Sequence, residues 1–374
     1  MALLYCSKCV LPNTRPNLNF DGSGNNCNCA TKEKKRAIDW DAREAKFKDL
    51  VSQIKRKKCQ YDCVIPVSGG KDSTWQVVKA VQFGLKPLCV TWRSPVRTDI
   101  GNENLQNLIS LGVDHVDFSI NPTIEKKIAL EAFEKKGSSV IPMHMAIHAL
   151  PLKFALAFKI PMVLWGENSA FEYGGDDEEL KGFEITKEWI KKYGVTNNTV
   201  ASDWESEFIS KSDLWPYTLP EEAFDTDRKI KGVFLGQFFK WDPVEVFEQS
   251  KIHGFKASEL VKTGIYDFAD IDDQFLITIH HWMKWYKFGF TRSWDNLSLE
   301  IRSERISREE AIAILRKNGL ECPIHEIKMF CDYVNIDLDR FWEICEMHRN
   351  KDIWTKRDGQ WVIEDFLISD FDWN

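Results

Sequence analysis

Residues 62–75 read DCVIPVSGGKDSTW, an apolar run that breaks into serine, glycine, lysine and aspartate. The apolar part has the length and the β-branched content of a buried strand, and a helix-like stretch, STWQVVKAVQFG (73–84), follows it. A strand–loop–helix unit gathers the backbone N–H groups of the loop and of the first helical turn around one point, where the helix dipole favours negative charge. The sequence therefore predicts an anion-binding site at residues 68–73.

The side chains of this loop suit a nucleoside triphosphate. Glycines let the chain bend and let phosphate oxygens approach the backbone amides. Serine hydroxyls add donors, a lysine adds positive charge, and an aspartate can hold the Mg²⁺ that accompanies ATP. The Walker pattern G-x-x-x-x-G-K-[ST] is absent. We expect ATP and Mg²⁺ at Ser68, Gly69, Gly70, Lys71, Asp72 and Ser73, with Lys71 and Asp72 in catalysis and Asp72 as the magnesium ligand.

The pattern S-G-G-x-D-S after a buried strand resembles the pyrophosphate loop (PP-loop) of the ATP pyrophosphatase superfamily. That superfamily includes asparagine, GMP and NAD synthetases and the tRNA thiolases. The resemblance implies cleavage of ATP between its α and β phosphates. The alternative is an ordinary strand-to-helix turn that is rich in glycine.

The rest of the chain alternates apolar runs with helical stretches. Strands are predicted at 86–92, 115–120, 160–168 and 232–239, and helices at 102–112, 123–136 and 144–159. This alternation predicts an α/β fold with a mostly parallel, Rossmann-like (HUP-type) sheet and helices on both faces. We divide the chain into a cysteine-rich segment (1–31), a linking amphipathic helix (32–58), the PP-loop domain (59–245) and a mainly helical C-terminal region (246–374).

Two further segments fall at the carboxyl ends of predicted strands, where open α/β sheets bind ligands. Residues 90–92 end the second strand, at the place where the superfamily holds adenine through backbone groups. The fourth strand ends in WGENSAFEYGG (165–175), which taken alone is also explained as a hydrogen-bonded turn. The residues assigned to the nucleotide in these segments are Val90, Thr91, Trp92, Gly166, Glu167 and Asn168.

Four of the ten cysteines crowd into the first 29 residues, as Cys6-x-x-Cys9 and Cys27-x-Cys29. Two close pairs can form a tetrahedral thiolate site around Zn²⁺ and so stabilise a segment too small for a core of its own. Four thiolates leave no open coordination position, so we expect a structural zinc. The alternative is that these cysteines are reduced and bind no metal.

Composition narrows the class of protein. The formal net charge is −7, whereas proteins that wrap nucleic acid carry a basic face, so we expect no nucleic-acid partner. No apolar run approaches the roughly 20 residues that span a bilayer. The start, MALLYCSKCV, lacks the regions of a signal peptide. We expect a cytoplasmic enzyme with reduced thiols and no membrane partner.

Arginines are dense in the segment 285–315, at positions 292, 302, 305 and 308. Ser307 and Glu310 predict a capping box at the start of a helix. Arginine side chains ahead of a helix suit the recognition of phosphate or carboxylate. On charge pattern alone we favour the alternative, a solvated face with salt bridges to Glu300, Glu304 and Glu309.

Six segments, taken in order, resemble the N-acetyl sugar amidotransferases of bacterial surface-polysaccharide pathways. They are YCSKCVLPNTRPNLNFDGSGNNCNC, PVSGGKDS, VTW, LWGENSAFEYGG, FKWDP and KFGFTRSWDNLSLEIRSERISREEAI. The match spans nearly the whole chain, and the later segments are more particular to this family than the first loop. One residue separates Cys27 from Cys29, where two are commoner in the family.

The resemblance implies an ATP-dependent, AMP-forming C–N ligase that converts a sugar acetamido group into an acetamidino group. Such sugars occur in lipopolysaccharide O-antigens and flagellar nonulosonic acids, and the substrate is free or nucleotide-linked. ATP would adenylate the amide oxygen, and ammonia would attack the O-adenylyl imidate. The implied partners are an ammonia-supplying glutaminase and a HisF-like cyclase subunit, as in imidazole glycerol phosphate synthase. We assign the sugar to Glu172, Tyr173, Arg292, Asp295 and Arg302.

Other functions fit parts of the sequence. A tRNA-thiolating enzyme of the same superfamily often carries zinc-binding cysteines, but it needs a basic surface, which the acidic balance disfavours. A non-catalytic nucleotide-binding scaffold has no need of Lys71, Asp72 and Ser73, which are all intact. A synthetase that amidates a carboxylate shares the adenylation step and differs only in its acceptor.

Overall fold

The centre of the fold is a five-stranded parallel sheet with the strand order β3-β2-β1-β4-β5. The computed structural model describes residues 3–25, 27, 35, 37–173, 184–225, 229–317 and 322–373. The strands are β1 (Cys63–Pro66), β2 (Pro87–Trp92), β3 (Asp114–Phe118), β4 (Met162–Trp165) and β5 (Lys231–Phe234). The chain moves outward from β1 through β2 to β3, and then returns to the other side for β4 and β5. The winding therefore reverses at β1, the position where such sheets bind ligands at their carboxyl ends.

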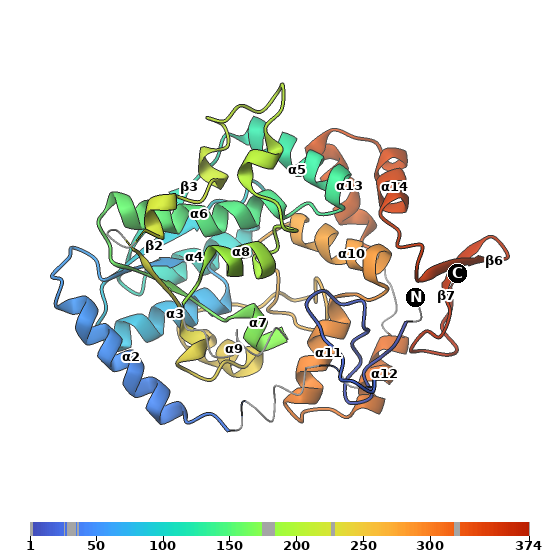
Figure 1. Ribbon diagram of the computed structural model, residues 1–374, viewed down its shortest axis with the longest axis horizontal. Coiled ribbons are helices and arrows are strands. Elements are labelled where there is room, and N and C mark those ends of the chain that lie inside the picture. The colour runs from blue at the N-terminus through green and yellow to red at the C-terminus, as the bar shows by residue number, and fades with distance from the viewer. Residues whose placement is uncertain are drawn as a thin grey trace.

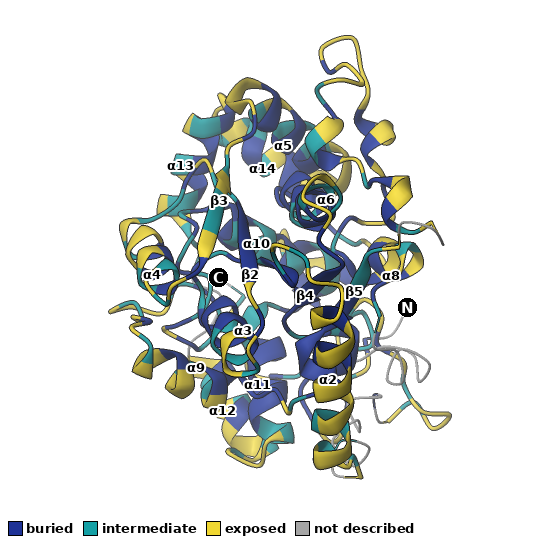
Figure 2. Cartoon of the chain, turned by 90° about the vertical axis from the view of Figure 1, so that its left-hand side faces the viewer, coloured by how far each residue is buried: buried dark blue, intermediate teal, exposed yellow. Residues whose placement is uncertain are grey.

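Alternate side chains of β1 enter two different cores, because successive residues of a strand point to opposite faces of the sheet. Cys63 and Ile65 pack in a cluster with Phe47, Trp75 and Leu105. Those three belong to α2 (Trp40–Lys55), α3 (Lys71–Gln82) and α4 (Asp99–Ile109), and α9 (Pro243–Ile252) packs on the same face. The strands β2 and β4 are buried between helices, whereas β3 at the sheet edge is more exposed (Figure 2).

The opposite face of the sheet is covered by α6 (Ile141–Ala157). Val64 of β1 packs there with Leu152 and Ala155. Beyond α6 lies α5 (Pro122–Lys136), and α8 (Lys187–Tyr193) adds its aromatic residues to the same core. The short helices are α7 (Ser169–Tyr173), η2 (Ala201–Trp204), η3 (Trp215–Tyr217), η4 (Glu221–Ala223) and η5 (Leu235–Gln237).

The C-terminal part consists of helices followed by a β-hairpin. The helices are α10 (Leu276–Phe288), α11 (Arg292–Arg302), α12 (Arg308–Lys317), α13 (Ile324–Val334) and α14 (Leu338–Met347). The antiparallel strands β6 (Trp354–Arg357) and β7 (Gln360–Ile363) end the fold. Cys6, Cys9 and Leu11 are part of the same core as α10–α14, so the N-terminal loop packs against α11 and α12 (Figure 1).

The predicted fold class, an α/β fold with a Rossmann-like parallel sheet, is confirmed. The fourth strand ends at Trp165 and not at residue 168, because Asn168 leaves the sheet and caps α7. The fifth strand is likewise short and passes into η5. A hairpin within the mainly helical C-terminal region was not predicted, although Asp358-Gly359, both with positive φ, form the kind of two-residue turn that favours one.

None of the described helices has the length and apolar character needed to cross a membrane.

Candidate functional site

Residues 67–70 connect β1 to α3 and are held by hydrogen bonds to β2, to α3 and within the loop. The N–H of Val67 donates to the carbonyl oxygen of Val90 (2.9 Å). The N–H of Ser68 donates to Ser73 Oγ (3.0 Å), and the N–H of Gly70 donates to Ser68 Oγ (3.2 Å). The loop therefore folds over the N-terminus of α3, and its shape is fixed by the serines that the sequence singles out.

Two glycines make this conformation possible. Gly69 has φ +92°, and a Cβ there would lie 2.7 Å from the backbone nitrogen of Leu105 in α4. Gly70 is the N-cap of α3 and provides no side-chain cap. Because the N–H groups in the first turn of a helix have no intrahelical partner, they remain available to an anion at this point.

Lys71 and Asp72 form an ion pair beside two aromatic rings. Lys71 Nζ lies 2.7 Å from Asp72 Oδ2, and Trp241 Nε1 donates to Asp72 Oδ1 (2.8 Å). The Lys71 ammonium is 5.3 Å from the centroid of the Trp241 ring and 5.7 Å from that of Phe268. Asp242, which caps α9, also accepts bonds from Arg305 and so anchors the segment that carries Trp241. The positions of Lys71 and Asp72 thus depend on residues about 170 to 200 positions away in the sequence.

The carboxyl ends of β2 and β4 lie on either side of the loop, as the sequence predicts. Pro66 pairs with Val90, and Val64 pairs with Val163. Thr91 Oγ1 donates to the carbonyl oxygen of Val67 (2.7 Å), so its side chain supports the loop. A Cβ on Gly166 would lie 2.0 Å from Gln76 Nε2, which shows how closely α3 packs against the end of β4.

Glu167 is a titratable residue that follows the end of β4, at the same edge of the sheet as the loop. Burial raises the pKa of Glu167 to about 7, and the negative charge of Asp72 adds to the increase, while Lys71 opposes it. A carboxyl group with a pKa near neutrality can accept or release a proton at physiological pH. Glu167 therefore lies beside the loop with the properties of an acid–base group.

Several residues that the sequence assigns to the site have side chains bonded to the fold itself. Asn168 Oδ1 accepts the N–H of Ala170 (3.0 Å) and Trp189 Nε1 (3.2 Å). Trp92 Nε1 donates to Glu125 Oε1 (2.7 Å). The Arg302 guanidinium donates to the carbonyl oxygens of Ser298 and Glu172 and to Ser298 Oγ. Glu172 is buried and pairs with Lys35.

Tyr173, at the end of α7, joins the loop to the C-terminal helices. Burial raises the pKa of Tyr173 to about 12; Arg292 opposes the increase, and Glu167, Asp295 and Asp72 add to it. All four charged side chains therefore lie near the phenol. The Arg292 guanidinium is 5.6 Å from the centroid of the Tyr173 ring. The structure thus brings the predicted sugar-binding residues Tyr173, Arg292 and Asp295 together beside the loop.

Sequence reasoning missed several residues of this site. Trp241 occurs in the segment FKWDP, which carried the family resemblance but was given no role. Arg15 lies 5.9 Å from the centroid of the Tyr173 ring and donates from Nε to Asp295 Oδ1 (2.8 Å). Phe268 and Lys284 also lie in the site. No local pattern marks these residues, because each reaches the loop only through tertiary packing.

Three of the four predicted zinc ligands lie together. The Sγ atoms of Cys6, Cys9 and Cys27 all lie within 4.8 Å of one another, and the three residues are buried. Cys6 Sγ accepts the N–H groups of Cys9 (3.5 Å) and Cys27 (3.3 Å). Such bonds stabilise a thiolate. The donor set therefore fits a zinc ion, and the fourth predicted ligand, Cys29, lies outside the described residues.

Arg308 connects this cysteine cluster to α12. Arg308 Nε donates to the carbonyl oxygens of Cys6 (3.2 Å) and Cys9 (2.9 Å). The predicted capping box is present, since Ser307 and Glu310 bond reciprocally through side chain and backbone. Arg305 forms a salt bridge with Glu300, one of the partners in the alternative that we favoured, but Glu300 is buried and this pair is not on a solvated face. The arginines of this segment therefore act largely within the fold.

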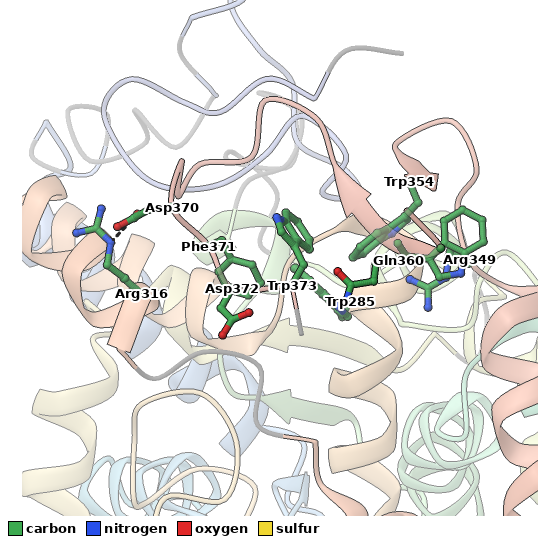
Figure 3. Close-up of a pocket in the computed structure, with 11 residues that line it drawn as sticks. Trp285, Arg316, Arg349, Trp354, Gln360, Asp370, Phe371, Asp372 and Trp373 are labelled. Atoms are coloured by element: carbon green, nitrogen blue, oxygen red, sulfur yellow. Dashed lines mark hydrogen bonds and ion pairs between the residues drawn. The ribbon is translucent and has the colours of Figure 1, made fainter. Parts of the chain in front are cut away.

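Two cavities lie near these elements. One of about 400 Å³ borders Trp241, Glu172 and Arg302 and so adjoins the loop. The other, of about 590 Å³, lies at the C-terminal hairpin (Figure 3). Aromatic side chains line it, among them Trp285, Trp354 and Trp373, together with the ion pair between Arg316 and Asp370. It contains none of the residues that the sequence assigns to the site.

Residues 255–367 match the family described as "LPS biosynthesis protein WbpG-like, C-terminal domain", where LPS is lipopolysaccharide. The match begins before Phe268 and ends after β7, and it covers less than a third of the chain. The C-terminal third of the chain is thus similar to a domain of lipopolysaccharide biosynthesis proteins. Among curated proteins, none matches this chain.

Three solved structures align with the chain at low identity. A predicted subunit of tRNA methyltransferase from Methanocaldococcus jannaschii is 15% identical over 50% of this chain and 76% of its own, with a TM-score of 0.29. NMN synthetase from Francisella tularensis is 16% identical over 58% and 93%, with a TM-score of 0.28. NH3-dependent NAD synthetase from Campylobacter jejuni is 17% identical over 60% and 100%, with a TM-score of 0.30. Identities and TM-scores this low carry no argument about function. The description of the fold and the site therefore rests on the strand order and the geometry of the loop.

Proposed function

We propose that this protein is an ATP-dependent, AMP-forming amidotransferase that converts the acetamido group of a sugar into an acetamidino group. The observation that carries the proposal is the loop 68–73, whose glycines leave the first-turn N–H groups of α3 open beside Lys71 and Asp72. The similarity of residues 255–367 to a lipopolysaccharide biosynthesis domain supports a sugar acceptor. The family resemblance in the sequence supplies the amidination reaction.

The residues of the loop fit ATP with Mg²⁺. The β and γ phosphates would bind the N–H groups at the start of α3 and the Lys71 ammonium. Both oxygens of Asp72 have partners, Lys71 and Trp241, but each carboxylate oxygen has a further lone pair for a metal ion. When bound, Mg²⁺ neutralises the charge that develops on the departing pyrophosphate.

The proposed reaction has two steps. The amide oxygen of the sugar attacks the α phosphorus, and the bond from that phosphorus to the oxygen of the β phosphate breaks, so pyrophosphate leaves. The nitrogen lone pair of ammonia then attacks the amide carbon, a proton is lost, and AMP leaves with the former amide oxygen. Glu167, whose pKa burial raises to about 7, would accept that proton.

We propose that the ammonia comes from a separate glutaminase that acts with a HisF-like cyclase subunit. The zinc ion held by the N-terminal cysteines would be structural, because Arg308 joins their loop to α12. Neither role places the metal or the partner in a bond-making step.

The proposal is tested by incubating the protein with ATP, Mg²⁺, ammonium chloride and a panel of acetamido sugars. We expect AMP and pyrophosphate in amounts equal to the modified sugar. The mass of the sugar should fall by about one dalton, because NH replaces O when the bound ammonia reacts with the activated amide. Formation of ADP and phosphate would contradict the proposal. AMP formation that depends on tRNA would favour a thiolating enzyme, and nucleotide binding with no turnover of any acceptor would favour a scaffold.

A further inference from the structure

Two buried polar atoms next to the end of β4 have no hydrogen-bond partner among the described residues. They are Nδ1 of His148, in α6, and Nε1 of Trp165, the last residue of β4. The two residues are 7% and 8% exposed, and the centroids of their rings are 5.0 Å apart. Because an unpaired buried polar group is costly, such a pair in a native protein indicates a bound ligand or a bound water molecule.

The two atoms are of opposite kinds. The Nε1 of an indole is a donor only. Burial, together with the nearby His144, lowers the pKa of His148 to about 3, so its imidazole is neutral at physiological pH. A bond to the backbone of Gly194 opposes this decrease, which identifies a ring N–H as the donor and the carbonyl oxygen as the acceptor. Since Nδ1 has no partner, Nε2 carries that proton, and Nδ1 is an acceptor.

The pair lies at the carboxyl edge of the sheet. Trp165 ends β4, and Glu167 follows it two positions later. The helix α8 lies beside α6 here, since the rings of Trp189 and His148 are 6.2 Å apart (Figure 1). A molecule held by both unpaired atoms would therefore lie at the edge of the sheet to which the loop 68–73 also belongs.

A secondary amide matches this pair of atoms. It has one N–H donor for His148 Nδ1 and one carbonyl acceptor for Trp165 Nε1. The acetamido group of the proposed sugar substrate is a secondary amide, and it is the group that reacts. A water molecule or a ribose hydroxyl of ATP also combines a donor with an acceptor, so these are the rival occupants.

We propose that His148 and Trp165 bind the acetamido group of the sugar and orient it for adenylation. This assignment rests on the proposed function and names the residues that recognise the reacting group. A carbonyl oxygen has two lone pairs, so one accepts the Trp165 N–H while the other attacks the α phosphorus. As that bond forms, positive charge develops on the amide nitrogen, and its hydrogen bond to His148 Nδ1 becomes stronger. The pair thus stabilises the transition state more than the bound amide.

The first test compares two sugars that differ only in the amide N–H, N-acetylglucosamine and N-acetyl-N-methylglucosamine. The full chain, with ¹⁵N in its histidine rings, is saturated with Mg²⁺ and α,β-methylene-ATP, which cannot be cleaved between the α and β phosphates. Each sugar is then titrated in. We expect the Nδ1 resonance of His148, identified by its loss in His148→Gln, to shift with N-acetylglucosamine and not with the methylated sugar. No shift with either sugar, or equal shifts with both, would overturn the proposal.

Two substitutions at His148 distinguish a ligand contact from a structural role. A glutamine amide reaches the position of Nε2, so His148→Gln retains the bond to Gly194 and removes the acceptor. An asparagine oxygen lies near the position of Nδ1, so His148→Asn retains an acceptor and loses that bond. We expect kcat/KM for the sugar in AMP formation to fall at least about tenfold in His148→Gln and to recover largely in His148→Asn, while KM for ATP changes less than about twofold. The reverse order would show that His148 only supports the backbone at Gly194.

Trp165→Phe retains an aromatic ring and removes the donor. We expect kcat/KM for the sugar to fall about tenfold, the effect of losing one hydrogen bond that is stronger in the transition state. Trp204→Phe is the matched control and should retain full activity. Its Nε1 is also buried and unpaired among the described residues, but Trp204 packs with α5 and α6 in a different core.

The rival occupants predict other results. Unchanged activity in both Trp165→Phe and His148→Gln would mean that a water molecule occupies the pair. A tenfold weaker Kd of α,β-methylene-ATP in these variants, measured without sugar, would assign the pair to the nucleotide. Either result would overturn the proposal.

The outcome for the proposed function is separate. If the wild-type protein forms no AMP with any acetamido sugar, the proposed function is refuted. The His148 resonance, followed with and without the nucleotide, then still decides whether this side chain binds an amide.

Discussion

At the residue scale, the candidate site depends on a few positions where only glycine fits, because there is no room for a side chain. Gly69 and Gly166 lie where α3 and α4 approach the strand ends so closely that a Cβ would meet other atoms. The sequence predicted the loop because its chemistry is local, with strand, glycines and helix start all within 14 residues. It did not predict Trp241, Phe268 or Arg15, since their place in the site follows from packing between distant segments.

Gly69→Ala tests whether the close approach of the loop to α4 matters. The substitution introduces both an unfavourable positive φ and a contact with the backbone of Leu105, so we expect a loss of about 2 to 3 kcal/mol in unfolding free energy and loss of ATP binding. Gly112→Ala is the matched control, because Gly112 has φ +90° with nothing near its missing Cβ. Urea unfolding and nucleotide titration measure both effects. Equal losses in the two variants would mean that only the backbone angle is responsible.

Glu125 gives a prediction for stability against pH. Burial raises the pKa of Glu125 to about 7, and the bond from Trp92 only partly offsets this. A carboxyl group whose folded pKa is raised favours the folded state when protonated, and that contribution is lost as pH rises from about 4.5 to 7. Glu125→Gln keeps an acceptor for Trp92, so we expect it to stabilise the protein at pH 8, by at most about 3 kcal/mol, and not at pH 4. A difference from wild type that is the same at both pH values in urea unfolding would contradict this.

At the scale of elements, the parallel strands were predictable because each is a short apolar run that ends in polar residues at the ligand edge. The end of β4 was predicted too far along, since the apolar pattern does not reveal that Asn168 caps α7. The hairpin β6–β7 was missed in a region dominated by helical periodicity, although Asp358-Gly359 is visible in the sequence. The association of the N-terminal loop with α12 depends on Arg308 and the cysteines and has no local signal.

The cysteine cluster predicts a structural metal. We expect about one Zn²⁺ per chain by elemental analysis, because closed thiolate sites bind zinc tightly. Cys6→Ser should lose the zinc and expose the N-terminal loop to proteolysis, since Cys6 Sγ is at the centre of the cluster. Cys59→Ser, at a half-buried cysteine outside the cluster, is the control and should retain the zinc. The prediction would be contradicted if the wild-type protein contained no zinc and Cys6→Ser resisted proteolysis as well as the wild-type protein does.

At the scale of the whole molecule, three separate parts of the chain surround the carboxyl edge of the sheet. The loop 68–73 supplies Lys71 and Asp72, and the N-terminal loop supplies Arg15. The C-terminal part supplies Lys284, Arg292 and Arg305, which anchors the segment of Trp241. The apolar core that joins the N-terminal loop to α10–α14 explains why Arg15 lies beside residues of α10 and α11.

Lys71→Met tests the assembled site. The ammonium lies between Asp72 and two aromatic rings, so its loss should reduce kcat/KM for AMP formation by about a hundredfold, the usual effect of removing a group that stabilises developing charge. Lys79→Met in the same helix, where the lysine lies over Phe239, is the control and should retain activity. Equal activity of the two variants would remove Lys71 from the mechanism.

In the proposed reaction, ATP transfers its AMP moiety to the amide oxygen of an acetamido sugar at the loop that follows β1. The most direct measurement uses a sugar whose acetamido oxygen is labelled with ¹⁸O, and mass spectrometry of the AMP that is released. We expect the label to leave the sugar and to appear in the phosphate of AMP. AMP without the label, or label retained in the sugar after turnover, would contradict it.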